Sequence, residues 1–218
     1  MVTGLRPETF QNLQLNAGVF LRNFVWNTYT TVQELEDAIL EALEEGGDKI
    51  LGATIGDGSF QCTPSIRNIE ANGMRYPIKG STVNDMWTVK LTGTMKEINP
   101  QTFADALICA DEEKSEDGKV TKIRVRTDIE DADYIPSICW VGDTSRGFVL
   151  IEVLNALNLT GANFTFTDKG EGSLPFEFQG HAADLKDMKY APCTIVFFDE
   201  PEAEAAAASD EPTEEQTE

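Results

Sequence analysis

Four acidic residues within six positions form the densest group of possible metal ligands in the sequence. They are Asp128, Glu130, Asp131 and Asp133. Carboxylate oxygens bind Ca²⁺, but an EF-hand loop also needs a glycine at its sixth position and a glutamate at its twelfth. Tyr134 and Ile135 follow instead. We therefore predict a surface turn that leads into a strand, with a metal-dependent enzyme built on these carboxylates as the alternative.

The other residues typical of catalysis stand alone. His181 is the only histidine, and the sequence has no Gly-x-Ser-x-Gly motif that it could serve. The segment Gly56-Asp57-Gly58 begins like a dinucleotide-binding fingerprint, but Gln61 stands in place of the third glycine. We interpret this segment as a turn. The sequence thus predicts no catalytic residue, no cofactor and no metal site, and a protein that is not an enzyme.

The four cysteines are far apart in the sequence. They are Cys62, Cys109, Cys139 and Cys193, and no C-x-x-C pair or histidine at metal-ligand spacing accompanies them. We expect reduced and mostly buried thiols.

Charge excludes a large class of functions. The 218 residues include 38 acidic and 17 basic side chains, which gives a net charge of -21. A protein that binds nucleic acid through its phosphates needs a basic face, so this class is excluded. Residues 199–218 hold nine acidic residues and no basic one. This composition predicts a body of residues 1–198 and a disordered acidic tail.

The amino-terminal residues and the hydropathy pattern bear on location. No apolar run reaches the roughly 18 residues that a membrane helix needs. Residues 1–10 lack the basic start and apolar stretch of a signal peptide. We expect synthesis in a cytoplasm and no membrane partner.

Most of the body carries strand patterns, and two segments carry helix patterns. Thr31 and Glu34 form a capping box before apolar residues at helical spacing, which predicts a helix over residues 32–45 with Val32, Leu35, Ile39 and Leu43 on its apolar face. Asn99 and Pro100 predict the start of a shorter helix. Alternation or apolar runs predict about eight strands, at residues 13–21, 87–95, 123–125, 138–141, 148–154, 164–166, 174–178 and 194–198.

This order of elements predicts the fold class. Consecutive strands without regular helical crossovers favour a mainly β (α+β) fold, an antiparallel β-sandwich or barrel with a flanking helix. Residues 46–84 are rich in Gly, Asp, Asn and Pro, which predicts a long excursion from the core. Trp26, Trp87 and Trp140 are predicted to pack in the core.

Several short segments, in order along the body, resemble one known family. They are LQLNAGVFL at residues 13–21, LGAT at 51–54, IRNI at 66–69, RTDI at 126–129, LNAL at 154–157 and GSLPF at 172–176. Pro64, Gly73, Pro77, Asp85 and Trp87 fall between them in matching order. In these segments the chain resembles the major tail proteins, the tail-tube subunits of bacteriophages with long, non-contractile tails. The acidic tail lies outside the resemblance.

The resemblance implies a structural virion protein. Subunits of this family form hexameric rings that stack into a hollow tube, through which viral DNA passes without specific binding. It implies a tail-tube β-sandwich over residues 1–198, an inter-ring loop or hairpin within residues 46–84, and assembly in the bacterial host cytoplasm into the virion. Partners would be further copies of the chain and the tape-measure, tail-terminator and tail-tip proteins. A contractile-tail or secretion-system tube is a related possibility.

For this assembly we predict a set of contacts between subunits. The candidate side chains are Arg67, Asn68, Arg75, Lys79, Asp85, Lys90, Lys96 and Asp128. Lys90 and Lys96 are expected to pair with carboxylates at a subunit interface. The alternative function is a β-sandwich module that binds carbohydrate or protein on a phage or cell surface, remains monomeric and exposes aromatic residues in a concave groove.

Overall fold

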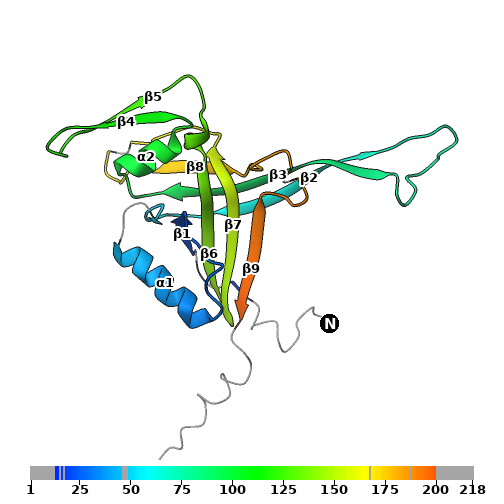
Figure 1. Cartoon of the computed structure of the whole chain (residues 1–218), viewed down its shortest axis with the longest axis horizontal. Helices are drawn as coiled ribbons and strands as arrows, with labels where there is room; N and C mark the ends of the chain where they lie inside the picture. Colours follow the sequence, from blue (N-terminus) through cyan, green and yellow to red (C-terminus); the bar gives the residue numbers. More distant parts are fainter. Residues whose placement is uncertain are drawn as a thin grey trace, which may run out of the picture.

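A computed structural model describes residues 13–14, 16, 18–45, 49–166, 168–186 and 188–199 (Figure 1). The strands are β1 (Val19–Arg22), β2 (Ser59–Asn68), β3 (Thr82–Met95), β4 (Ala110–Lys114), β5 (Thr121–Val125), β6 (Ile135–Thr144), β7 (Gly147–Asn158), β8 (Leu174–Gln179) and β9 (Cys193–Asp199). The helices are α1 (Val32–Glu45) and α2 (Pro100–Ala106). Every strand pair is antiparallel. The predicted mainly β fold with an antiparallel sheet is confirmed.

The main sheet changes direction at β7. Its order is β1-β6-β7-β8-β3-β2, and β9 also pairs with β7. Strand β7 pairs with β6 and β9 along most of its length, but with β8 only at Leu157 and Asn158. The two halves, β1-β6-β7-β9 and β8-β3-β2, therefore enclose a core between them. Its largest side chains include Phe20, Ile138, Val153, Val89, Leu91, Phe176 and Phe178. This arrangement is consistent with a β-sandwich.

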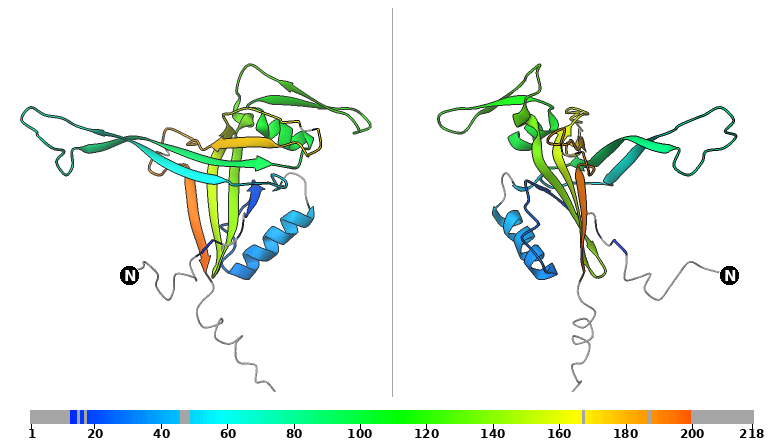
Figure 2. Two further views of the ribbon diagram at one scale, coloured as in Figure 1. Left: turned by 180° about the vertical axis from the view of Figure 1, so that it is seen from behind. Right: turned by 45° about the vertical axis from the view of Figure 1, so that its right-hand side comes forward.

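Helix α1 covers the other face of the first half (Figure 2). Leu35, Ala38 and Ile39 are buried there against Leu21 and Leu150. The predicted capping box is present because the Glu34 amide donates to Thr31 Oγ1 while the Glu34 carboxylate accepts from the Thr30 and Thr31 amides. These hydrogen bonds, chiefly that from Thr30, lower the pKa of Glu34. Within the described residues, no helix is long and apolar enough to cross a membrane.

The second helix fastens the corner where the two halves meet. Asn99 caps α2 by accepting from the Thr102 amide at 2.8 Å, and Pro100 is its first residue, as predicted. The buried Asn158 at the end of β7 donates to the Ala106 carbonyl at 2.9 Å and accepts from the Glu177 amide of β8. Such a satisfied buried amide fixes one arrangement of the helix and the strands.

The structure corrects two strand predictions. Residues 13–21 were expected to form one strand, but β1 begins at Val19. Gly18 has a φ of 72°, and its amide donates to Asn16 Oδ1, so a turn interrupts the chain before β1. Residues 164–166 contribute only an isolated bridge between Thr165 and Ser173. Strands β2 and β4 were not predicted. Strand β4 is exposed at all residues but Ala110 and has no apolar alternation. In β2, Phe60 and Cys62 face the core, but Pro64 follows them and the strand lies in a segment rich in Gly, Asp, Asn and Pro.

Two predictions of burial are also wrong. Leu43 of α1 is exposed, because Ala38 and Ala42 complete the buried face of the helix in its place. Trp87 of β3 is 46% exposed, whereas Val89, Leu91 and Met95 of the same strand are buried. The reason is that β3 continues beyond the body, and Trp87 lies where the strand leaves it.

Candidate assembly surfaces

The most prominent surface feature is a long hairpin formed by β2 and β3. The two strands pair from Ser59 and Thr92 to Asn68 and Thr82, with a shift in register between Ser65 and Ile66. Figures 1 and 2 show that this hairpin projects away from the rest of the molecule. Strand β2 and the turn lie within the excursion predicted for residues 46–84, whereas β3 continues beyond it to Met95. We call residues 64–87 the distal arm.

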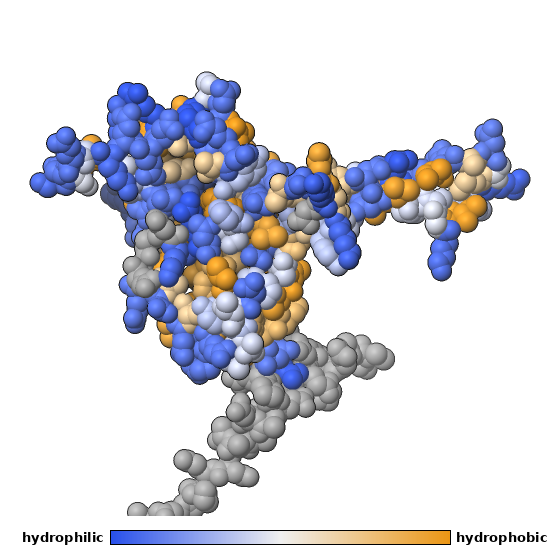
Figure 3. Space-filling view, in the orientation of Figure 1, coloured by the Kyte–Doolittle hydropathy of each residue, from blue (hydrophilic) through white to orange (hydrophobic). Residues whose placement is uncertain are grey.

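The two ends of the hairpin differ in burial. At the root, β8 pairs with Lys90 to Met95 of β3, and Leu91 and Met95 are buried. On the distal arm, large apolar side chains are exposed, and Figure 3 shows them along its length. They are Ile66, Ile69, Tyr76, Ile78, Met86 and Trp87. Tyr76 is 81% exposed. A row of exposed apolar side chains on a projecting element is typical of an interaction surface.

Five of the eight predicted contact residues lie on the distal arm. They are Arg67, Asn68, Arg75, Lys79 and Asp85, and all are exposed. Arg67 Nε donates to both carboxylate oxygens of Asp85 at 2.8 Å. Asn68 Oδ1 accepts from the Thr82 hydroxyl at 2.9 Å across the last strand pair.

The other three predicted contact residues lie elsewhere. Lys90 pairs with Glu177 of β8 at 2.6 Å, and Lys96 pairs with Glu171 at 3.0 Å. Both lysines thus have carboxylate partners within their own chain, and a contact with another subunit stays a prediction. Asp128 is exposed in the loop after β5, apart from the arm.

The arm differs in charge from the remainder of the protein. It has three basic residues, Arg67, Arg75 and Lys79, against the acidic Glu70 and Asp85. The rest of the chain has 36 acidic and 14 basic residues. A slightly positive arm is therefore attached to a strongly negative protein. A difference in charge of this kind favours contact of the arm with an acidic surface.

The acidic group that suggested a metal site surrounds an arginine. Arg126 contacts Glu130 at 2.8 Å, Asp111 at 3.1 Å and, through Nη2, Asp133. The hydrogen bond to Glu130 and the neighbouring carboxylates raise the pKa of Arg126. Asp131 to Asp133 form a 3-10 turn that leads into β6, as predicted. Among the described residues, no group of three or more acidic, histidine or cysteine side chains could hold a metal ion.

His181 lies at a small cavity of about 350 Å³ beside β7 and β9. Its Nδ1 lies 3.1 Å from the Asn155 carbonyl oxygen, and its ring packs edge-on against Tyr134. Asn155 has a φ of 45° and donates in return to the His181 carbonyl. These contacts give the histidine a structural role in holding an irregular point of β7.

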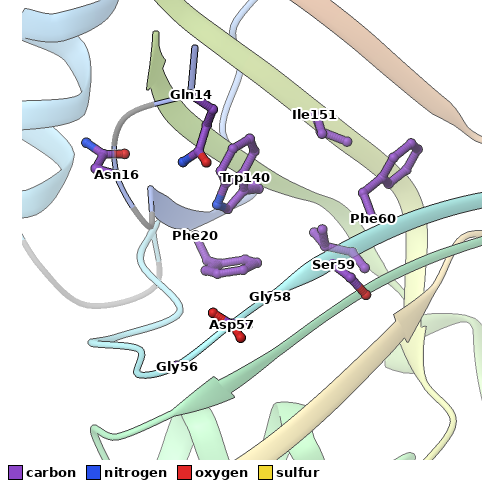
Figure 4. Close-up of a pocket in the computed structure, with 11 residues that line it drawn as sticks. Gln14, Asn16, Phe20, Gly56, Asp57, Gly58, Ser59, Phe60, Trp140 and Ile151 are labelled. Atoms are coloured by element: carbon purple, nitrogen blue, oxygen red, sulfur yellow. The ribbon is translucent and has the colours of Figure 1, made fainter.

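A larger cavity of about 630 Å³ opens between the two halves of the sheet. Figure 4 shows Gln14, Phe20 and Trp140 on one side and residues 56–60 across from them. Gly56 has a φ of 73°, so the predicted turn is present. Asp57 supplies a carboxylate, while Phe20, Phe60 and Trp140 supply aromatic surface. The cavity could hold a small polar ligand or a peptide side chain, with ring faces for packing.

Strand β9 is a further candidate surface that the sequence did not reveal. It lies at the edge of the first half of the sheet. Ile195 and Phe197 are exposed on the face opposite α1, and Phe197 is 65% exposed. Their alternation with Val196 and Phe198 predicted a strand but not its place at an edge. An edge strand with exposed apolar residues can pair with another chain.

No protein-family model matches this sequence, and no curated protein matches it with statistical significance.

Proposed function

We propose that this chain is a self-assembling structural protein. More specifically, we propose a tail-tube subunit of a phage with a long, non-contractile tail, forming stacked hexameric rings through which DNA is ejected. The observation that carries the proposal is the β2–β3 hairpin. It is rooted in the core, extends beyond the body, and bears exposed apolar residues and a positive charge on an acidic protein. These properties suit contact with a second copy.

The sheet edges also support the proposal. Contacts between unlike surfaces of identical subunits close into rings by rotation and form open stacks by translation. Strands β2 and β9 have an edge that could extend the sheet into a neighbour, whereas the edge of β1 is bridged by Ile50 and Leu51. The more specific proposal of a tail-tube subunit rests on the short segments that resemble that family and on their order along the body.

The net charge fits a conduit for DNA. A bore lined by lysine and arginine would bind phosphates and release counterions, and thereby hold the DNA. An acidic wall repels the polymer and keeps it mobile. The charge of -21 is compatible with that requirement.

Negative-stain electron microscopy of the concentrated protein tests this function. The full chain would be compared with a chain ending at Phe198. Rings or hollow tubes from either would support the proposal, and tubes from the shorter chain alone would make the acidic tail an inhibitor of assembly. Monomers in both, at high protein concentration and with charges screened by salt, would count against it.

The cavity at Trp140 favours a second candidate function. A binding module would use the aromatic residues around this cavity to hold a carbohydrate or a peptide. It would remain monomeric, and Trp140→Ala would lower its affinity for the ligand. A glycan array and a peptide array with the full chain would reveal this activity, and tube formation would argue against it.

A further inference from the structure

Two of the four cysteines pack against the same core cluster, although they come from strands that do not pair. Cys62 lies in β2, opposite Val89, and Cys193 begins β9, opposite Val153. Both side chains are half-buried against the core between the two sheet halves. Cys62 lies close enough to Cys193 to help raise the pKa of the Cys193 thiol, after the larger effect of burial. Strand β2 pairs with β3, and β9 pairs with β7, so the two cysteines belong to different sheet edges.

A glycine makes the close approach possible. The Gly180 amide, just after β8, donates to the Val89 carbonyl at 3.0 Å. A Cβ atom at Gly180 would lie 2.9 Å from both the Pro192 carbonyl oxygen and Val153 Cγ1. Only a residue without a side chain lets the start of β9 pack this closely against the strand beside Cys62.

We propose that Cys62 and Cys193 form a reversible disulfide that fastens the root of the β2–β3 hairpin to β9. This inference does not depend on the proposed assembly, because it concerns a bond within one chain. The bond would link the two sheet halves at a point where no backbone pairing joins them. It would therefore restrain the hairpin against movement relative to the body.

A small-molecule disulfide such as oxidised glutathione is the oxidant. Cys193 borders the cavity beside His181, which gives the reagent access. The Cys193 thiolate attacks one glutathione sulfur, forms a mixed disulfide and releases one glutathione thiolate, which takes up a proton. The Cys62 thiolate then attacks the Cys193 sulfur and releases the second glutathione. Two protein thiols lose two electrons, and one glutathione disulfide becomes two thiols.

The reaction should be slow near neutral pH. Burial, with a smaller contribution from Cys62, raises the pKa of the Cys193 thiol to about 11. At pH 7 only about one thiol in 10⁴ is then ionised, and the thiolate is the reactive form. Between pH 7 and 10 the rate of the first step should rise about tenfold for each pH unit. The disulfide should therefore form slowly near neutral pH.

The remaining two thiols provide matched controls. Cys109 Sγ donates to the Arg126 carbonyl at 3.2 Å, and Cys139 Sγ contacts the Phe24 carbonyl at 3.9 Å. Burial also raises the pKa of Cys139, to about 12. Each of these thiols is buried and has a carbonyl partner, so neither should join a disulfide in the folded protein.

The test is oxidation of the folded full-length chain with oxidised glutathione at pH 8.5. Thiols would then be counted in denaturant, and peptides mapped by mass spectrometry without reduction. We expect the count to fall from four to two, with a cross-linked pair of peptides containing Cys62 and Cys193. Four remaining thiols, a lasting glutathione adduct or a different cross-link would overturn the proposal.

Variants and thermal melting extend the test. Cys62→Ser should leave a glutathione adduct on Cys193, whereas Cys109→Ser should form the same cross-link as the natural chain. The cross-linked protein should melt several degrees higher, and dithiothreitol should reverse this shift. A lower melting temperature after cross-linking would contradict the fastening role. If Cys62→Ser does not fold, the peptide map of the natural chain still decides the matter.

Discussion

Two hairpins leave the body in opposite directions, and they differ in what their side chains contact (Figure 2). In the shorter one, β4–β5, Glu113 pairs with Lys122 at 3.3 Å and Asp117 with Lys119 at 3.7 Å. Its turn is closed by Ser115, whose hydroxyl donates to Asp117 and accepts from the Val120 amide. Two ion pairs and the Ser115 hydroxyl thus link residues within this hairpin, and its exposed large apolar side chains are Val120 and Val125.

The longer hairpin, β2–β3, has the opposite character. Its distal arm has a net charge of +1, an exposed ion pair between Arg67 and Asp85, and six exposed large apolar side chains. Side chains of this kind gain most when a second molecule covers them. The comparison teaches that length alone does not make a hairpin an interaction element. Exposed apolar surface and a charge opposite to that of the body distinguish the arm.

The largest expected effect comes from shortening each hairpin in turn. Asn68 and Thr82 are paired, so Asn-Gly in place of residues 69–81 would close β2–β3 with a two-residue turn. We expect loss of all rings and tubes in electron micrographs. The body should retain its fold, as judged by circular dichroism, because the hairpin's buried residues lie at its root.

The matched control shortens the other hairpin. Lys114 and Thr121 are paired, so Asn-Gly in place of residues 115–120 makes an equivalent turn in β4–β5. This variant should assemble like the natural chain. If both shortened chains assemble, or if only the control fails, the arm is not the assembly element.

The second prediction separates the root of β3 from its distal part. Leu91 is 2% exposed, so Leu91→Ala should lower the free energy of unfolding by about 3 kcal/mol through lost burial and a residual cavity. Met86, in the same strand but exposed, is the control. Met86→Ala should change stability by no more than about 0.5 kcal/mol and yet weaken assembly. Urea unfolding measures the first effect, and sedimentation measures the second. Equal stability losses would show that the arm is packed.

The same contrast explains how much of the fold the sequence could predict. Helix α1 was predictable because Thr31 and Glu34, three positions apart, form a capping box within a few residues of its start. The root of β3 was predictable because Val89, Leu91 and Met95 fall at alternate positions, as in a half-buried strand. Burial of Trp87 was predicted wrongly, because the alternation continues past the point where the body ends. Strand β2 was missed because the alternation of Phe60 and Cys62 is short, is followed by Pro64, and lies in a segment rich in Gly, Asp, Asn and Pro.

The candidate surfaces were predictable only in part. Five of the predicted contact residues fall on one arm because they lie within 19 positions of one another in a single hairpin. Asp128 lies away from the arm, because it belongs to the loop after β5. The contact between Cys62 and Cys193 joins residues far apart in the sequence, and it depends on how β8 and Gly180 place two sheet edges. No local pattern encodes such a contact.

The third prediction reverses charge on each hairpin. Arg75→Glu with Lys79→Glu makes the arm negative, and the resulting repulsion from an acidic partner should raise the protein concentration needed for assembly at least tenfold at low salt. Lys119→Glu with Lys122→Glu changes the total charge equally but lies on β4–β5. Light scattering over a concentration series measures the threshold. If both pairs raise it equally, general repulsion and not the arm is responsible.

The smallest expected effect concerns the one ion pair of the arm. Arg67 and Asp85 side chains are 60% and 42% exposed, so water and salt screen their attraction despite the favourable geometry. Asp85→Asn should therefore reduce the free energy of unfolding by only about 0.5 kcal/mol. Glu113→Gln, which breaks the exposed pair with Lys122 on β4–β5, should have a similar effect. Both differences should vanish in about 1 M salt, where the screening length falls to about 3 Å. A much larger loss for Asp85→Asn, persisting in salt, would mean that the pair supports the arm's own structure. The arm's contribution to assembly would then have to be separated from its folding before the two hairpins could be compared.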